Sequence, residues 1–135
     1  MARIIKTITQ TSVSVIAMYQ HVSNVSHQMY FDLGKADFYR QVLQDDVLSG
    51  TSRIITAATA NSFKEQIRME DDIYVTTTVA KVGNKSITLF QQIIGRNAAG
   101  RETVKTESTS VMVAFDFDRQ ESVTVPERWR RNLAD

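Results

Sequence analysis

Two side chains that can act on a carbonyl group directly precede a segment with helical periodicity. His21 and Asn24 belong to a polar stretch that runs into an amphipathic helix. Ser23 and Asn24 are favoured N-cap residues, so we expect the helix to begin there and to end near Leu43. The first helical turn carries backbone N–H groups without intrahelical partners, which stabilise an oxyanion when they point at a carbonyl. These residue types in one place indicate acyl chemistry.

The predicted helix has one apolar stripe and one glycine in its interior. The stripe follows helical spacing and consists of Val25, Met29, Leu33 and Ala36. Gly34 costs roughly 1 kcal/mol relative to alanine in a helix. We expect a small residue at this position if the helix packs closely against a sheet.

The segment 21–39 resembles the hallmark of the 4-hydroxybenzoyl-CoA thioesterase family, in the hotdog-fold superfamily. The family pattern is a Gly-His-Val-Asn-Asn loop, followed along the helix by Tyr-x-Glu-x-Ala-Arg. His27 stands where tyrosine is usual, and the matching residues are His21, Val22, Asn24, Tyr30, Asp32, Gly34 and Lys35. A second block, 70–86, matches the family's Gly-Asp and Val-Gly-x-x-Ser motifs, with Ser86 as the serine. The resemblance covers nearly the whole chain.

The order of predicted elements agrees with the fold that this resemblance implies. Alternating apolar and polar residues predict strands, and Gly83-Asn84 predicts a tight turn between two of them. The expected strands are 3–16, 53–63, 72–82, 85–96 and 101–117, and a short helix over 127–133 follows Pro126. We therefore expect an α+β hotdog fold, with a curled antiparallel sheet of about five strands around one long central helix, as a single domain over 1–135.

The chain departs from the family pattern in the loop before the helix. Many members carry a catalytic aspartate four residues before the loop histidine, where this chain has Ala17, and Gln20 replaces the loop glycine. Alanine is neither a base nor a nucleophile. Either another group takes that role, or the protein is not a thioesterase of the usual kind.

Asp32 is the first candidate for the missing acid–base group. Related hotdog thioesterases without the loop aspartate use a helix carboxylate in a similar context, and such a carboxylate can attack a thioester or activate water. The alternative is a solvated helix residue paired with Lys35 or Lys81. His21 is the second candidate, as a hydrogen-bond donor or a residue that positions water, although it can also simply hold the loop. Asn24 is expected to cap the helix and to fix its first N–H groups.

Substrate contacts are expected from two groups of residues. Tyr19, His27 and Tyr30 are candidates for the acyl pocket, although aromatic residues at such spacing are more often core. Lys85, Ser86 and Arg96 are candidates for the phosphates of coenzyme A, and the alternative is ordinary surface charge.

The composition excludes several classes of function. The 135 residues contain no cysteine and carry a net charge of +1, which argues against disulfide frameworks, cysteine nucleophiles and a strong attraction to nucleic acid or membrane. Two histidines six positions apart do not suggest a metal site. No leader or long apolar run is evident, so we expect a cytoplasmic protein.

Two functions follow from the resemblance. The first is hydrolysis of an acyl-CoA or acyl-carrier-protein thioester by a homodimer or homotetramer with its site at the subunit interface, with coenzyme A only as part of the substrate. The second is a hotdog protein that binds acyl groups or partners and has lost catalysis, as Ala17 and Gln20 suggest. A specialised polyketide or β-keto acyl substrate is a further alternative.

Overall fold

The computed structural model describes residues 4–9, 24–43, 52–68 and 70–134. Its elements follow the predicted order, and the strand bounds within the described ranges agree with the predictions to within one residue, apart from the first strand. They are β1 (Ile5–Thr9), α1 (Asn24–Phe38) continued by a π-helical segment (Tyr39–Leu43), β2 (Ser52–Phe63), β3 (Asp72–Val82), β4 (Ser86–Arg96), β5 (Glu102–Asp116), β6 (Glu121–Ser122) and α3 (Glu127–Leu133). The rest of the predicted first strand lies outside the described residues.

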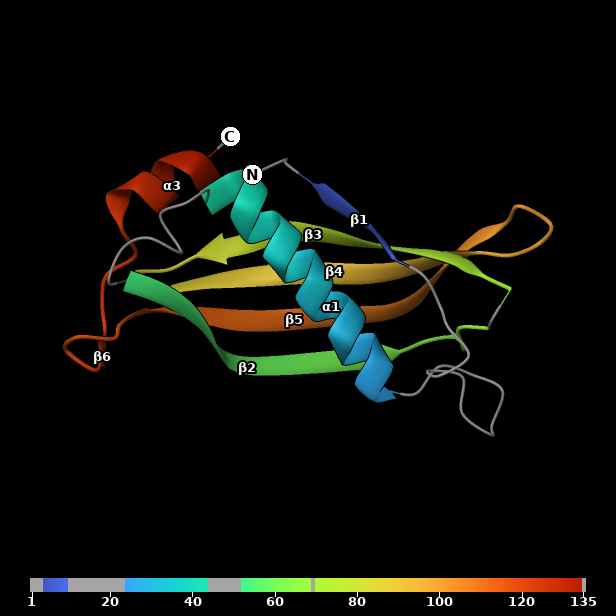
Figure 1. Cartoon of the computed structure of the whole chain (residues 1–135), viewed down its shortest axis with the longest axis horizontal. Helices are drawn as coiled ribbons and strands as arrows, with labels where there is room; N and C mark the ends of the chain where they lie inside the picture. Colours follow the sequence, from blue (N-terminus) through green and yellow to red (C-terminus); the bar gives the residue numbers. More distant parts are fainter. Residues whose placement is uncertain (1–3, 10–23, 44–51, 69, 135) are drawn as a thin grey trace.

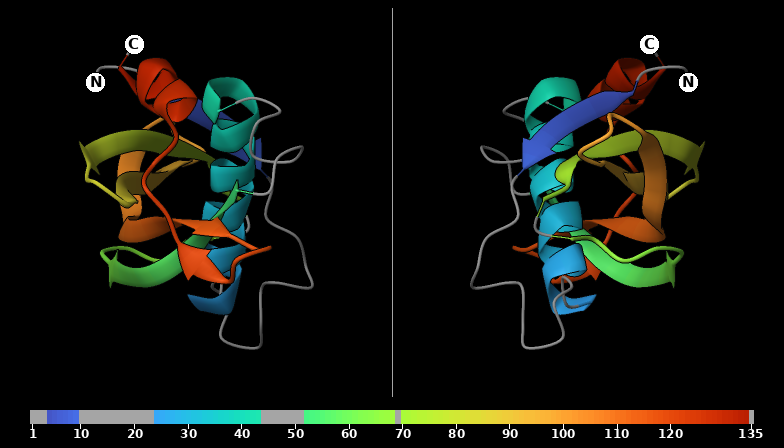
Figure 2. Two further views of the ribbon diagram at one scale, coloured as in Figure 1. Left: turned by 90° about the vertical axis from the view of Figure 1, so that its left-hand side faces the viewer. Right: turned by 90° about the vertical axis from the view of Figure 1, so that its right-hand side faces the viewer.

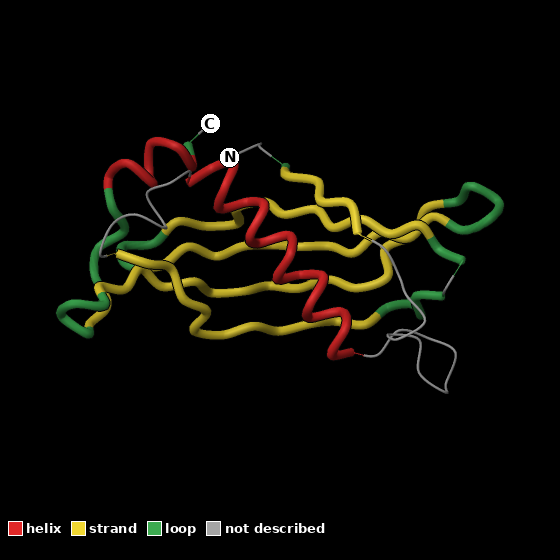
Figure 3. Tube along the Cα trace, in the orientation of Figure 1, coloured by secondary structure: helices red, strands yellow, loops and turns green. Residues whose placement is uncertain are grey.

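All described strands join one antiparallel sheet in the order β1-β3-β4-β5-β2, and the two-residue β6 pairs with the end of β5. α1 crosses one face of this sheet obliquely, from β2 toward β1 (Figures 1 and 3). Viewed along the sheet, the strands form a curved layer with α1 on its inner side (Figure 2). The predicted hotdog fold is therefore confirmed, with β6 as an addition that the sequence pattern did not predict.

α1 approaches the sheet most closely at Gly34. A Cβ atom at this position would lie 2.8 Å from Val75 Cγ1 and 2.9 Å from Gln91 Nε2. Gln91 Nε2 donates to the backbone oxygen of Phe31 at 2.9 Å and to Thr77 Oγ1 at 3.0 Å. This amide therefore ties the middle of the helix to the middle of the sheet, and the expectation of close packing at Gly34 is confirmed.

Two apolar clusters fill the space between α1 and the sheet. One lies toward the π-helical segment and α3, and its largest buried members include Trp129, Phe38 and Leu43. The other lies toward the start of α1 and includes Tyr30, Phe31 and Ile93. Burial of each large side chain contributes roughly 1.5–3 kcal/mol, so both ends of α1 are held by apolar contacts.

The described members of the predicted apolar stripe face away from the sheet, and the side chain of Val25 lies outside the described residues. Met29 and Leu33 are 57% and 52% exposed, and Ala36 is exposed as well. The helix side that meets the sheet instead carries His27, Phe31, Gly34 and Phe38. Because the sheet below α1 is partly polar, its helix partner does not need a continuous apolar stripe.

We predict that Gly34→Ala destabilises the fold, although alanine is the better helix former. The added methyl group must displace buried Val75 or Gln91, and such overpacking costs about 1–3 kcal/mol. Ala36→Gly, at an exposed position of the same helix, is the matched control and should lose only about 1 kcal/mol of helix propensity. Chemical denaturation measures both. A Gly34→Ala variant more stable than wild type would show that the contact is loose.

Candidate active site

The start of α1 lies against β2 and β5. α1 begins at Asn24, as predicted, and its first turn is followed by the buried His27. Nδ1 of His27 lies 2.6 Å from Thr106 Oγ1, and its ring packs edge to face against Phe63 at 5.1 Å between centroids. His27 was expected on the helix flank or in the acyl pocket, and the structure places it between the helix and the sheet. These contacts fix the direction in which the first N–H groups of α1 point.

Asp32 lies on an exposed flank of α1. Its side chain is 66% exposed, and its nearest described partners are Gln28 Nε2 at 3.4 Å and Lys35 Nζ at 3.9 Å. Gln28 also accepts a hydrogen bond from Asn61 of β2 at 3.1 Å, which shows that this flank faces the β2 side of the sheet. The predicted pairing of Asp32 with Lys35 is present, but at a distance beyond a hydrogen bond.

Asp32 and the start of α1 are separated along the helix axis. At about 1.5 Å per residue, Asp32 lies about 12 Å beyond Asn24 and about 8 Å beyond His27, the last residue of the first turn. A single thioester carbonyl is smaller than either distance. The carboxylate and the first-turn N–H groups of one chain therefore lie at different places along the helix.

Lys35 is buried beside Asp32. Its side chain is only 5% exposed, and among the described residues its Nζ has no hydrogen-bond acceptor. Burial lowers the pKa of Lys35, because an ammonium ion loses hydration, and the nearby Asp32 carboxylate opposes this effect only in part. A buried cation with an incomplete set of partners is unfavourable for folding.

A polar layer lies beneath α1. Directly paired residues of neighbouring strands share one face of a sheet, so Thr77, Gln91, Ser108 and Asn61 form one row from β3 to β2. Thr77, Gln91 and Ser108 are buried. In the adjoining positions Thr59 Oγ1 lies 3.3 Å from Ser108 Oγ and 3.1 Å from Ser110 Oγ. The layer separates the two apolar clusters and becomes more hydroxyl-rich toward β2.

The tyrosines of the helix are buried. Tyr30 is 5% exposed, and its hydroxyl has no described partner, so burial raises the pKa of its phenol. Burial also raises the pKa of Tyr39, and the Asp32 carboxylate adds to this shift. The core interpretation of Tyr30 therefore agrees with its place in the apolar cluster at the start of α1.

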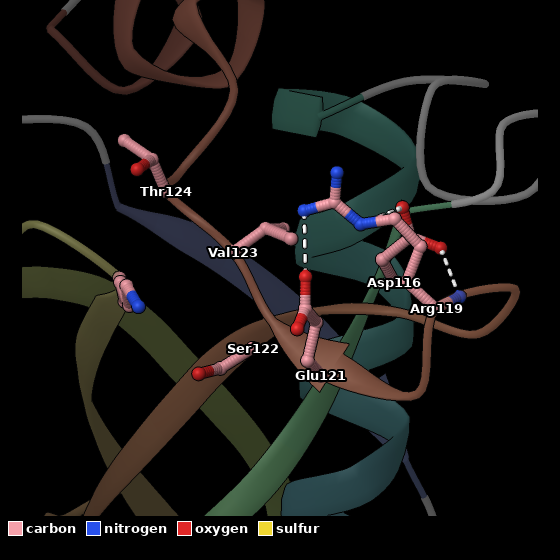
Figure 4. A pocket seen from close by; sticks show the side chains of 7 residues that line it. Asp116, Arg119, Glu121, Ser122, Val123 and Thr124 are labelled. Atoms are coloured by element: carbon pink, nitrogen blue, oxygen red, sulfur yellow. Dashed lines mark hydrogen bonds and ion pairs between the residues drawn. The ribbon is translucent and has the colours of Figure 1, made fainter.

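Lys85 lines an open pocket of about 470 Å³ at one end of the sheet, beside β6. Figure 4 shows Arg119 between Glu121 and Asp116 on the wall of this pocket. Arg119 Nη2 lies 2.7 Å from Glu121 Oε1, and Ser122 and Thr124 add hydroxyl groups. Ser86 follows Lys85 as the first residue of β4. The sequence did not single out Arg119, which lies in a turn without a recognisable motif.

Arg96 lies at the opposite end of β4. It lines a second pocket, of about 290 Å³, with Lys6, Tyr74 and Glu102. Tyr74 alternates with the buried Ile73 and Val75, so this pocket opens on the sheet face away from α1. The structure therefore does not bring Arg96 together with Lys85 and Ser86.

The remaining candidates lie outside the described residues. These are Tyr19 and His21, together with Ala17 and Gln20 of the loop, and the side chain of Asn24. Within the described ranges, no group of three or more His, Cys, Asp or Glu side chains is placed to hold a metal ion. No helix in those ranges is long and apolar enough to cross a membrane.

We predict that Lys35→Met raises the free energy of unfolding at neutral pH by about 1 kcal/mol or more, because it removes a poorly paired buried charge. Since folding lowers the pKa of Lys35, the unfolded chain binds more protons between that pKa and the ordinary lysine value. The free energy of unfolding of wild type should therefore rise with pH in this window. The difference in unfolding free energy between Lys35→Met and wild type should become smaller.

Urea denaturation between neutral and alkaline pH measures this effect. The matched control is Lys81→Met, which removes an exposed lysine of β3 and should follow the wild-type pH dependence. A Lys35→Met variant that is less stable than wild type at neutral pH would show that the charge supports the fold.

Comparison with known proteins agrees with this architecture. The family model of the thioesterase-like superfamily matches residues 12–133. A predicted thioesterase from Bacillus stearothermophilus superposes with a TM-score of 0.85 at 22% identity, over 98% of this chain and 95% of that one. A mutant 4-hydroxybenzoyl-CoA thioesterase complexed with 4-hydroxybenzoyl-CoA superposes with a TM-score of 0.88 at 13% identity, over 98% of this chain and 99% of that one.

A Thermus thermophilus thioesterase complexed with coenzyme A and zinc gives a TM-score of 0.82 at 15% identity, over 96% of this chain and 97% of that one. A search of curated protein sequences finds no significant match. The family match spans most of the chain and confirms the predicted family, and with it the expectation of a thioester hydrolase at the level of the family. The chain belongs to the thioesterase-like superfamily.

Proposed function

We propose that the protein hydrolyses an acyl-CoA thioester at a site composed of two subunits. The observation that carries this proposal is the separation of about 12 Å between the start of α1 and Asp32, on a helix whose exposed flank faces β2. One chain supplies both the first-turn N–H groups and the Asp32 carboxylate, but at two different places along α1. A second chain whose α1 runs in the opposite direction brings the N–H groups of one helix close to the carboxylate of the other.

β2 is suited to pair with a second copy. It forms one edge of the described sheet, and within the described chain this twelve-residue strand pairs with β5 alone among the strands. Residues 54–62 contain no charge and no proline, although proteins commonly use such residues to block pairing at sheet edges. An edge without these features favours strand addition, and we expect a homodimer joined through β2. Assembly of two dimers into a homotetramer is compatible with it.

The symmetry of this dimer explains the composite site. An antiparallel pairing of two β2 strands about a two-fold axis places the Asn61 end of one strand beside the Arg53 end of the other. The two α1 helices then run in opposite directions. The start of one helix faces the later turns of its partner, where Asp32 lies.

The groups at such a site have complementary roles. The first N–H groups of α1 stabilise the negative charge that develops on the thioester oxygen. In one route the Asp32 carboxylate accepts a proton from water, whose oxygen attacks the carbonyl carbon; the carbon–sulfur bond then breaks, and the departing thiolate takes up that proton. In the other route the carboxylate attacks the carbonyl carbon itself, the thiolate departs and is protonated by solvent, and water then hydrolyses the resulting mixed anhydride to free acid and carboxylate. His21, if the loop holds it near the carbonyl, adds a donor or positions the water.

We place the nucleotide part of coenzyme A at the Lys85 pocket. Lys85 and the hydroxyls of Ser122 and Thr124 suit phosphate groups, and Ser86 is the next residue of β4. This pocket includes Asp116, which pairs with Ser52 at the beginning of β2. The proposed dimer brings that end of β2 beside the start of the partner's α1. Arg96, on the opposite sheet face, fits this arrangement less well.

We predict that wild-type protein releases free thiol from acyl-CoA and that Asp32→Asn lowers kcat by about 100- to 10,000-fold, because the amide cannot accept the proton. Glu127→Gln, which changes an exposed carboxylate on α3 in the same way, is the control. A thiol-reactive dye and a panel of short, long and aryl thioesters provide the assay. Full activity of Asp32→Asn would show that the Asp32 carboxylate is not the catalytic base or nucleophile. Retention of acyl-CoA without turnover by folded wild type would favour the acyl-binding alternative.

We predict that two inactive variants restore activity when they share a dimer. Val25→Pro removes one first-turn N–H, a group without an intrahelical acceptor, and loss of one oxyanion donor costs roughly 100- to 1,000-fold. In a heterodimer of Val25→Pro and Asp32→Asn, one composite site carries both changes and the other carries neither. The heterodimer should therefore have about half the activity of the wild-type dimer.

Two different affinity tags allow this heterodimer to be purified. If each site lay within one chain, both sites of the heterodimer would carry one defect, and no activity would return. A monomer in sedimentation analysis would also contradict the composite site.

A further inference from the structure

The amine of Lys35 is the polar group that the fold leaves most incompletely bonded beside the proposed catalytic carboxylate. Its side chain is more than nine-tenths buried, and Nζ has no acceptor among the described residues. The closest carboxylate oxygen, Asp32 Oδ1, is 3.9 Å away. An ammonium group has three N–H donors, so this site has unused capacity to donate hydrogen bonds.

The packing of the fold does not require this charge. An unbranched apolar side chain such as methionine fills a similar volume without losing hydration, and buried ion pairs often add nothing to stability. The neighbouring residue, Gly34, already provides the close contact with Gln91 and Val75. A role in ligand binding accounts for the amine better than a role in packing.

Lys35 is close to the surface and to the expected position of the substrate. The Asp32 side chain beside Nζ is 66% exposed, so the amine lies just beneath the flank of α1 rather than in a closed core. The same flank contacts β2 through Gln28 and Asn61, at the expected subunit junction. Thr59, Ser108 and Ser110 bring three hydroxyl groups together on the inner face of β2 and β5, so this part of the sheet beneath α1 is polar rather than hydrocarbon-like.

We propose that Lys35 Nζ is a specificity-determining donor that binds an oxygen on the acyl chain, so that the preferred substrates are thioesters of short hydroxy-, keto- or carboxy-acyl groups. This inference rests on the proposed function, because that function places the thioester carbonyl at Asp32. Nζ lies 3.9 Å from Asp32 Oδ1, so this donor and the proposed catalytic carboxylate are close enough to contact one short acyl group. Four-carbon acyl groups are therefore the test case.

Four acyl-CoA esters of equal chain length test this inference: butyryl-, 3-hydroxybutyryl-, acetoacetyl- and succinyl-CoA. For wild type, kcat/KM should be at least tenfold higher for one or more of the oxygenated esters than for butyryl-CoA. Lys35→Met should lower that ratio by roughly 10- to 100-fold, the range of a hydrogen bond to a charged group. The ester with the greatest loss identifies the class of oxygen that Lys35 binds. Lys81→Met is the control and should keep the wild-type ratio.

An equal loss for all four esters would overturn the inference, because Lys35 would then act through Asp32 or through the fold. A wild type without preference for the oxygenated esters would overturn it as well.

Binding of thioether analogues separates this inference from the proposed function. Thioethers of coenzyme A with the same four-carbon groups cannot be hydrolysed, and calorimetry reports their affinity. Tight binding of an oxygenated analogue that Lys35→Met weakens, without hydrolysis of any ester, would reject the proposed hydrolase and keep the Lys35 site. Hydrolysis without any effect of Lys35→Met on the ratio or on this binding would keep the hydrolase and reject the Lys35 site.

Discussion

The contact between Gly34 and the amide of Gln91 determines how the rest of the molecule is arranged. The absence of a side chain at Gly34 lets the helix backbone lie on β3 and β4, and Gln91 Nε2 bonds to the Phe31 oxygen and to Thr77. This contact sets the depth and the rotation of α1. The rotation decides that Asp32 and Gln28 turn toward β2, while Phe31 and Phe38 enter the core. The geometry of the proposed site therefore depends on a contact that takes no part in the chemistry.

The core beneath α1 combines apolar ends with a polar middle. The clusters around Trp129 and around Phe31 supply the burial energy, while Thr77, Gln91 and Ser108 must find partners inside the protein. A buried polar layer costs stability wherever a donor or acceptor is left unpaired. Among the described residues, the buried groups without a hydrogen-bond partner are Gln91 Oε1 in this layer, Lys35 Nζ on α1, and polar atoms of Tyr30, Tyr39 and Trp129. Of these, only the Lys35 amine carries a charge, and it lies beside the exposed carboxylate of Asp32.

The sequence predicted the elements well because local patterns determine them. Alternation along β3, β4 and β5 gave their bounds to within one residue, and the polar types at Ser23 and Asn24 gave the start of α1. The orientation of the helix was not predictable, since Met29 and Leu33 are apolar yet exposed. Periodicity identifies a stripe but not what the stripe packs against, and the sheet under α1 is too polar to reveal the contact face. The separation of Arg96 from Lys85 already followed from the predicted strand 85–96, whose two ends they occupy, and only the sheet face of Arg96 needed the structure.

The rigidity of α1 keeps Asp32 apart from the first turn of the same helix, which favours a composite site. Helix rise is a fixed quantity, so no adjustment of loops brings Asp32 to the first turn of its own helix. The proposed site takes the two groups from two helices, and the exposed, uncharged edge of β2 offers a way to bring a second helix near. The exposed Met29 and Leu33 lie on the outer side of the same helix, where a further subunit would cover them in a homotetramer. The proposed dimer thus accounts for catalysis, edge pairing and the outward apolar residues with one arrangement, and in it the monomer would be only a part of the functional unit.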